Sequence, residues 1–138
     1  MKIKSIEKVE KFDVWDISVP EGNCFILDNG VVAHNSMYPK DVVSGGCLFG
    51  DMKVITVDGA KEIKDIRNGD KVLTMDGTYQ DVLYHWDESN LEEPTPECYE
   101  IELEDGSIIR CSDKHKFIID GVWTESKNIK VGDDIQTI

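Results

Sequence analysis

The sequence of 138 residues lacks several features that would assign it to common classes of protein. No run approaches the roughly 18 apolar residues of a membrane span, and Met1-Lys2-Ile3-Lys4 lacks the apolar core of a signal peptide. Lys and Arg number 15 against 28 Asp and Glu, so the net charge is −13. Phosphate binding requires clustered basic charge. We therefore expect a cytoplasmic, reducing location, and no nucleic acid or membrane as a partner.

The cysteine pattern lacks the spacing of a metal site. Cys24, Cys47, Cys98 and Cys111 include no Cys-x-x-Cys pair, so a structural zinc site is not expected. Without a secretory signal, free thiols are expected in place of disulfides. Hydrophobic residues make up 40% of the chain and charged residues 31%, which is typical of a globular protein. The length predicts one domain with a real core.

Asx-Gly dipeptides are frequent and separate short runs rich in Val, Ile, Thr and Tyr. Such dipeptides favour tight hairpin turns, so their density predicts an all-β fold. The six dipeptides are Asn29-Gly30, Asp58-Gly59, Asn68-Gly69, Asp76-Gly77, Asp105-Gly106 and Asp120-Gly121. The acidic stretch 87–97 interrupts the pattern and is predicted to be a loop.

An internal echo indicates a duplicated β-subdomain. The segment from Val57-Asp58-Gly59 to Val72 resembles the segment from Ile119-Asp120-Gly121 to Ile135. The two copies differ by one residue of spacing. This repetition predicts pseudo-twofold symmetry.

Two short stretches carry groups for acyl transfer. In His34-Asn35-Ser36, an asparagine able to attack its own backbone carbonyl stands between a proton-transfer group and a hydroxyl nucleophile. Cys47 is a second nucleophile, and Gly45-Gly46 before it leaves its amide unhindered. Residues 36–46, which contain Pro39 and end in Ser-Gly-Gly, are predicted to be a connector.

These stretches resemble the splice junctions of inteins in inverted order, with the end of an intein before its start. Cys47 to Asp51 resembles the first intein block, although Met52 stands where the family usually has Thr. Cys111 to Phe117 resembles the block with a Thr-x-x-His pattern, with Ser112 in the Thr place. Residues 14–36 resemble the last two blocks. The four blocks are in consistent order once the chain is rotated to start at Cys47.

The resemblance implies roles for individual residues. His115 would hydrogen-bond the amide nitrogen between Gly46 and Cys47 and act as a general acid. Asp16 would lie near both junctions and assist nucleophile exchange. Asp51 matches the Asp of the first block, and Asn23 stands where the family often has a His.

The resemblance also implies a fold and a function. The fold would be a single Hint or intein β domain, horseshoe-like, with residues 1–35 as its C-terminal segment and 47–138 as its N-terminal segment. The function would be autocatalytic, single-turnover splicing by Cys47, Ser36 and Asn35, joining Gly46 to Ser36 in a ring of residues 36–46. This order looks like a split intein whose halves are fused tail to head. The partners would be the complementary segment and the flanking peptides, in a monomer, with no cofactor.

Two other functions fit the same residues. A Hint-type Cys/His autoprocessing hydrolase would use Cys47 and His115 but would not need Asn35 and Ser36. A non-catalytic β-module with an acidic surface for protein binding would need none of them. Taken alone, His115 is expected to be a surface residue in a Lys-rich turn, and Asp16 a strand acid facing water.

Overall fold

The computed structural model describes residues 1–10, 13–19, 24–34, 47–87 and 97–138. Their regular structure consists of β-strands and short 3₁₀ helices, which confirms the all-β prediction. Asn23, Asn35, Ser36 and Gly46 lie outside the described residues, as do the remainder of the 36–46 connector and most of the predicted loop at 87–97.

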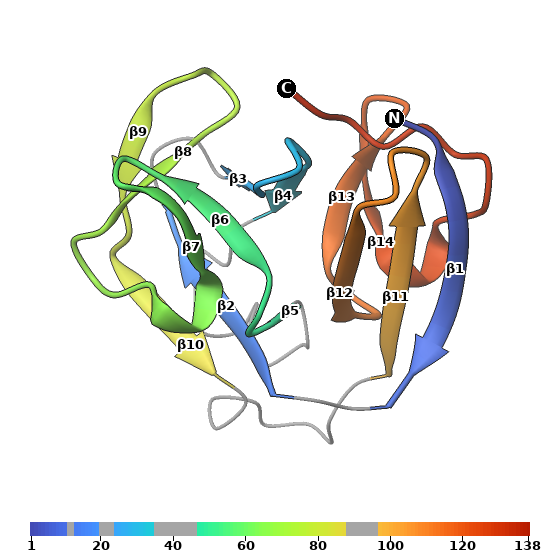
Figure 1. The fold of residues 1–138 in the computed structure, drawn as a ribbon, viewed down its shortest axis with the longest axis horizontal. Coiled ribbons are helices and arrows are strands. Elements are labelled where there is room, and N and C mark those ends of the chain that lie inside the picture. Colours follow the sequence, from blue (N-terminus) through green and yellow to red (C-terminus); the bar gives the residue numbers. More distant parts are fainter. Residues whose placement is uncertain (11–12, 20–23, 35–46, 88–96) are drawn as a thin grey trace.

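A six-stranded antiparallel sheet runs through the centre of the molecule (Figure 1). Five of its six strands contain buried residues, and the sixth, at one edge, contains only half-buried and exposed residues. In spatial order they are β1 (Ile3–Val9), β11 (Cys98–Leu103), β12 (Ile108–Ser112), β5 (Leu48–Phe49), β2 (Val14–Ser18) and β10 (Tyr84–Asp87).

Two four-stranded sheets complete the fold. One contains β14 (Val122–Glu125), β13 (Lys116–Ile119), β4 (Val32–His34) and β3 (Cys24–Ile26). The other contains β7 (Gly59–Glu62), β6 (Lys53–Thr56), β8 (Lys71–Leu73) and β9 (Tyr79–Asp81). In Figure 1, β6 to β9 and β11 to β14 stand on opposite sides, and the β3–β4 hairpin lies between them. Two 3₁₀ helices, η1 (Ile63–Asp65) and η3 (Ser126–Asn128), follow β7 and β14.

Strands from the first 34 residues are interleaved with strands from 47–138. β1 pairs with β11, β2 pairs with both β5 and β10, and β4 pairs with β13. An isolated bridge joins Leu27 to Val54. The main hydrophobic core contains residues of both segments, such as Val14 and Phe25 from the first and Leu48 and Phe117 from the second. The two segments therefore build one core.

The predicted pseudo-twofold symmetry is visible in the strand pairing. In the six-stranded sheet, β1, β11 and β12 mirror β10, β2 and β5 in order. The β6–β7 hairpin pairs 53 with 62 and 56 with 59, and the β13–β14 hairpin pairs 116 with 125 and 119 with 122. Equivalent positions of these two hairpins are therefore 63 residues apart in the sequence.

The constant offset corrects one detail of the sequence echo. Asp58 lies in the turn before Gly59, which already begins β7, whereas Asp120-Gly121 forms the whole turn before β14. The Asp-Gly dipeptides are thus displaced by one position, while the strands around them remain in step. The difference of one residue in the echo comes from the turn and not from an insertion between the copies.

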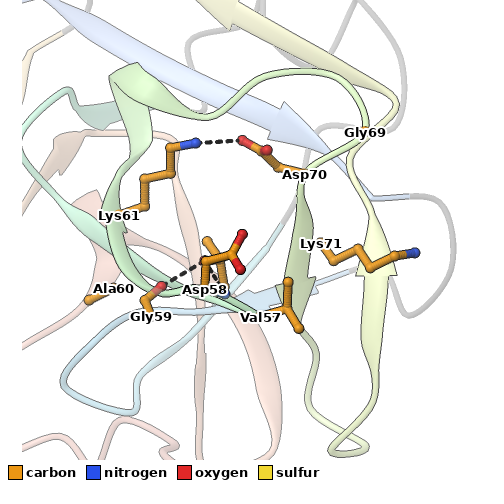
Figure 2. Close-up of a pocket in the computed structure, with 9 residues that line it drawn as sticks. Val57, Asp58, Gly59, Ala60, Lys61, Gly69, Asp70 and Lys71 are labelled. Atoms are coloured by element: carbon orange, nitrogen blue, oxygen red, sulfur yellow. Dashed lines mark hydrogen bonds and ion pairs between the residues drawn. The ribbon is translucent and has the colours of Figure 1, made fainter.

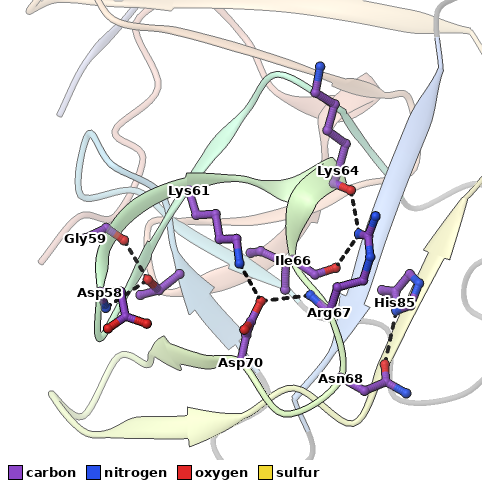
Figure 3. Close-up of polar contacts among 10 residues, drawn as sticks. Asp58, Gly59, Lys61, Lys64, Ile66, Arg67, Asn68, Asp70 and His85 are labelled. Carbon is purple, nitrogen blue, oxygen red and sulfur yellow. Dashed lines mark hydrogen bonds and ion pairs between the residues drawn. The ribbon is translucent and has the colours of Figure 1, made fainter.

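The turns after η1 and η3 are also equivalent. The Arg67 N–H donates to Asp70 Oδ2 at 2.9 Å (Figure 3). The Lys130 N–H donates to Asp133 Oδ2 at 2.8 Å. The glycines directly before these two aspartates, Gly69 and Gly132, have φ of 90° and 91°. Asn68-Gly69 therefore forms a turn between η1 and β8, whereas the other five Asx-Gly dipeptides lie at or beside hairpin turns.

The first residue contacts a segment close to the C-terminal end of the chain. The Met1 ammonium group donates to Asp134 Oδ1 at 2.7 Å and to the Ile135 carbonyl at 2.9 Å. Figure 1 shows both ends on the same side of the molecule. Within the described part of the chain, no helix is long and apolar enough to cross a membrane.

Candidate active site

Strand register places Asp16, Cys47 and Ser112 side by side in the six-stranded sheet. Leu48 of β5 pairs with Trp15 of β2 on one side and with Cys111 of β12 on the other. One residue along the same register, Cys47 stands opposite Asp16 and Ser112. Residues directly opposite in an antiparallel pair project from the same face. The sheet therefore brings together three residues from three distant parts of the sequence.

Ser112 forms hydrogen bonds with both the backbone N–H and the backbone carbonyl of Cys47. The Cys47 N–H donates to Ser112 Oγ at 2.8 Å, and the Ser112 hydroxyl donates to the Cys47 carbonyl at 3.1 Å. The Ser112 N–H donates to the same carbonyl at 2.8 Å. All these groups are buried, so water does not compete for the bonds. The peptide that enters Cys47 is consequently fixed in orientation.

Burial keeps the Cys47 thiol protonated. Its side chain is fully buried, and this desolvation raises the pKa of the thiol well above its ordinary value. The nearby carboxylate of Asp16 and the thiol of Cys98 raise that pKa further. A thiol in this setting needs a base at the moment of attack. Asp16, which is itself only 1% exposed, is the carboxylate in position to act as that base.

His115 is buried and uncharged at neutral pH. Burial, followed by the proximity of His34, lowers the pKa of its imidazole from 6.5 to about 3. Neither ring nitrogen has a hydrogen-bond partner among the described residues. The expected hydrogen bond between His115 and the Cys47 nitrogen is therefore not formed, because the Cys47 N–H donates to Ser112 Oγ at 2.8 Å. Leaving a buried polar group unpaired costs about 1–3 kcal/mol, and such groups are typical of reactive sites. The expectations of a surface His115 and a solvent-facing Asp16 are both wrong, because each side chain is 1% exposed.

A short turn fixes His115 relative to Ser112. The His115 N–H donates to the Ser112 carbonyl at 3.3 Å. Ser126, at the start of η3, donates its N–H to the His115 carbonyl at 2.8 Å and its hydroxyl to the Ser112 carbonyl at 2.5 Å. The Lys127 N–H donates to the Asp113 carbonyl at 2.9 Å. Sequence analysis missed Ser126, because no pattern in the sequence connects it with a turn more than ten residues earlier.

His34 reaches the same turn from the neighbouring sheet. Ala33 of β4 pairs with Phe117 of β13, so the register places His34 beside Lys116, the residue next to His115. The imidazole of His34 makes an edge-on contact with the indole of Trp123. Trp123 was also missed by sequence analysis, because its partner lies 89 positions away.

Two further predictions concern Asp51 and metal binding. Asp51 is exposed and pairs with Arg110 at 3.3 Å, so among the described residues it contacts neither Cys47 nor His115. Its neighbour Met52 occupies the position equivalent to His115 in the other copy, and the Ile63 N–H donates to the Met52 carbonyl as Ser126 donates to His115. In the described ranges, no group of three or more His, Cys, Asp or Glu is arranged to hold a metal ion.

A surface pocket also lies on the copy of the duplicated unit that does not contain His115. It is lined by residues of β6, β7 and the turn before β8 (Figure 2). Its two lysines are already paired: Lys61 Nζ lies 3.0 Å from Asp70, and Lys71 Nζ lies 2.7 Å from Asp81. The pocket therefore offers no free cation to a ligand.

Comparisons with known proteins agree with this architecture. Residues 53–137 match the family described as the Pretoxin HINT domain. The matched region contains Ser112 and His115, and it begins after His34 and Cys47. A stretch of 99 residues is 36% identical to Warthog protein 6 of Caenorhabditis elegans. That stretch covers 64% of this chain and 16% of the worm protein, so the chain is similar to one part of it.

Hint domains are autoprocessing domains, and the family match spans more than half of the chain together with the buried Ser112–His115 turn. The chain belongs to the Pretoxin HINT domain family.

Proposed function

We propose that this Hint domain is a self-splicing intein that joins Gly46 to Ser36 and releases residues 36–46 as a ring. The observation that carries the proposal is the placement of the two residues that border the segment 35–46. His34 and Cys47 lie in different sheets, yet both are held beside the turn from Ser112 to His115. An acyl group leaving one junction would therefore find the other junction close by.

In the first step, Cys47 Sγ adds to the Gly46 carbonyl carbon and the bond between that carbon and the Cys47 nitrogen breaks. Asp16 would take the proton from sulfur, and His115 would donate its N–H to the departing nitrogen. The proton held by Asp16 would then pass to the His115 ring, so that both groups return to their starting states and the net transfer is from the thiol to the released amine. The Ser112 hydroxyl holds the Cys47 N–H at 2.8 Å, so the peptide is presented in one orientation. Positioned groups of this kind contribute roughly 10²–10⁴-fold each.

The remaining steps move the acyl group to Ser36 and release the ring. Ser36 Oγ attacks the thioester and displaces the Cys47 sulfur, which takes up the proton. The side-chain amide nitrogen of Asn35 attacks its own carbonyl, which cuts the Asn35–Ser36 bond and forms a succinimide. The ester then rearranges to an amide through the freed Ser36 amine. Closing a ring of this length costs on the order of 2 kcal/mol of chain entropy.

A second function is cleavage without ligation. The family match covers His115 and Ser112 but not Asn35 or Ser36, and a Hint-type hydrolase would need only the first pair together with Cys47. Water would then attack the thioester in place of Ser36, and the segment 36–46 would stay linear and attached to residues 1–35.

Intact mass measurements after purification test the proposal. Splicing gives a ring of residues 36–46 that is lighter by one water than the linear peptide, whereas hydrolysis cuts only between Gly46 and Cys47. Asn35→Ala should block release at Ser36 and leave the thioester, so added thiol should then cut between Gly46 and Cys47. Cys47→Ala should abolish cleavage by thiol and still permit slow cutting after Asn35. A ring formed by Asn35→Ala would contradict the mechanism.

A further inference from the structure

An indole–imidazole contact joins two strands that are not adjacent in their sheet. The ring centres of Trp123 and His34 lie 4.8 Å apart, and their planes meet at 87°. Trp123 belongs to β14 and His34 to β4, with β13 between them. Trp123 pairs with Ile118 and His34 stands beside Lys116, two residues earlier on β13. Residues two apart share one face of a strand, so the contact runs diagonally across β13.

The contact restricts the rotation of the His34 side chain, which has charged neighbours. On the same face of the sheet, the row that contains His34 also contains Lys116 and Glu125. Without the Trp123 indole beside it, the His34 imidazole could rotate toward either of these charged side chains. Edge-on aromatic contacts contribute beyond their buried area and define the angle between the rings. The indole therefore sets the plane of the His34 ring.

The pseudo-twofold copy supplies an internal comparison. The position equivalent to Trp123 is Ala60, which lies in β7 opposite Ile55. The position equivalent to His34 is Asp28, whose N–H donates to the Lys53 carbonyl at 2.9 Å. The second copy thus forms the same sheet without either ring. Folding of this architecture does not require the pair, and the pair occurs in the copy whose β4 leads directly into Asn35.

We infer that Trp123 is a positioning residue for His34, whose imidazole moves the proton when Asn35 attacks its own carbonyl, and that Trp123 has no part in thioester formation at Cys47. The inference rests on the proposed splicing function. Its geometric basis is that β14 contacts the side of the site that carries His34. The Cys47 amide is held instead by Ser112 of β12.

Trp123 also covers a small hydrophobic cluster formed by Cys24, Ile26, Val32 and Ile118, so a purely structural role must be separated from positioning. Trp123→Phe keeps a ring beside His34, and Trp123→Leu keeps apolar cover without a ring. Each change is made in two backgrounds. Cys47→Ala reports cutting after Asn35, and Asn35→Ala with added thiol reports cutting between Gly46 and Cys47.

We expect Trp123→Leu to slow cutting after Asn35 by about tenfold, because a misoriented proton-transfer group loses part of the gain from positioning. Cutting between Gly46 and Cys47 should keep its rate. Trp123→Phe should restore most of the lost rate at Asn35. In NMR spectra, the His34 ring protons should lose their ring-current shift in Trp123→Leu and keep a shift in Trp123→Phe. Trp123→Met, which fills more of the indole volume without a ring, replaces the leucine variant if that variant does not fold.

Equal slowing at both junctions by Trp123→Leu would overturn the inference, as would a phenylalanine variant as slow as the leucine variant. Unchanged His34 shifts in Trp123→Leu would also overturn it. These outcomes differ from a failure of the proposed function. If neither background variant cuts at its junction when Trp123 is intact, splicing itself is contradicted. If both cut and neither responds to Trp123→Leu, only the inference is contradicted.

Discussion

At the scale of single residues, burial decides the chemistry of the two groups that flank Ser112. It holds the Cys47 thiol in its neutral form and the His115 imidazole in its neutral form. In the proposed splicing reaction, both groups would act from uncharged states at neutral pH, and the proton would pass between them and Asp16.

The lowered pKa of His115 predicts that the stability of the fold depends on pH. Its pKa is about 3 in the folded chain and about 6.5 when unfolded, so between these values the unfolded chain binds the extra proton. The contribution of His115 to the free energy of unfolding should therefore rise with pH across this window, by up to roughly 1.4 kcal/mol per unit, and stay constant above it. Urea unfolding from about pH 4 to pH 7 should show this slope, and His115→Gln should reduce it.

The matched control for this experiment is His85→Gln. His85 is half-buried and contacts Asn68 at 3.1 Å, on the opposite copy of the duplicated unit. We expect this variant to keep the slope of the parent chain. An unchanged slope in His115→Gln would show that His115 takes up its proton as readily in the folded chain as in the unfolded one.

At the scale of elements, η3 supports the site through its first turn. Ser126 and Lys127 donate backbone N–H groups to His115 and Asp113, and η1 donates in the same way from Ile63 and Lys64. The backbone support is thus common to both copies. The buried hydroxyl occurs in the copy that contains His115, since Ile63 stands at the position equivalent to Ser126.

Ser126→Ala should destabilise the fold by about 1 kcal/mol, because it removes a buried bond of 2.5 Å to the Ser112 carbonyl. The comparison is Thr124→Ala, which removes an exposed hydroxyl bonded to the Val122 carbonyl at 3.0 Å and should change stability by less. Chemical denaturation of both variants measures the difference. Equal losses would mean that the Ser126 hydroxyl adds nothing to the backbone bonds of η3.

The turn of the β3–β4 hairpin depends on Gly30. Its φ is +89°, and a methyl group there would lie 3.3 Å from the Ile138 carbonyl oxygen. Gly77 has a similar φ of +86° with nothing within 4 Å of a methyl group. Both alanine variants should lose about 1–2 kcal/mol from backbone strain. Gly30→Ala should lose more stability than Gly77→Ala, and thermal unfolding should show this as a lower midpoint temperature. If Gly77→Ala is equally destabilised, the contact with Ile138 is unimportant.

At the scale of the whole molecule, the fold depends on both segments of the chain. Eleven of the buried apolar residues lie between Ile3 and Ala33. At about 1.5–3 kcal/mol for each large side chain, their burial exceeds the net stability of a typical domain. Without them, β5 and β11 would become sheet edges and β13 would lose β4.

Residues 47–138 alone should therefore lack a folded core, and adding a separate chain of residues 1–46 should restore it. Amide NMR spectra measure the change as a gain in dispersion on mixing. The control is a shorter chain that carries both Cys24→Ser and Phe25→Ala, which change buried side chains of β3. Its mixture with residues 47–138 should regain less dispersion of the amide signals. Dispersed amide signals from 47–138 by itself would contradict the prediction.

Local patterns in the sequence were enough to predict an all-β fold. Asn29-Gly30 was among the predicted hairpin turns and lies in the turn between β3 and β4, because turn residues act over a few positions. The duplication was also visible, since equivalent turns require similar residues. The blocks that resemble inteins indicated the Hint fold and named Cys47, Ser112 and His115, although no local pattern placed these three beside one another.

Only the tertiary structure decided which residues meet. Asp16 and Cys47 become neighbours because β2 and β5 pair, and the register of that pairing depends on the whole sheet. Taken alone, His115 and Asp16 were expected to face water because their side chains are polar, and packing against distant strands buried them. Trp123 and Ser126 contact the site from β14 and η3, elements placed there by the fold. The sequence by itself identified the reactive groups, and long-range strand pairing determined their geometry and the burial that sets their protonation.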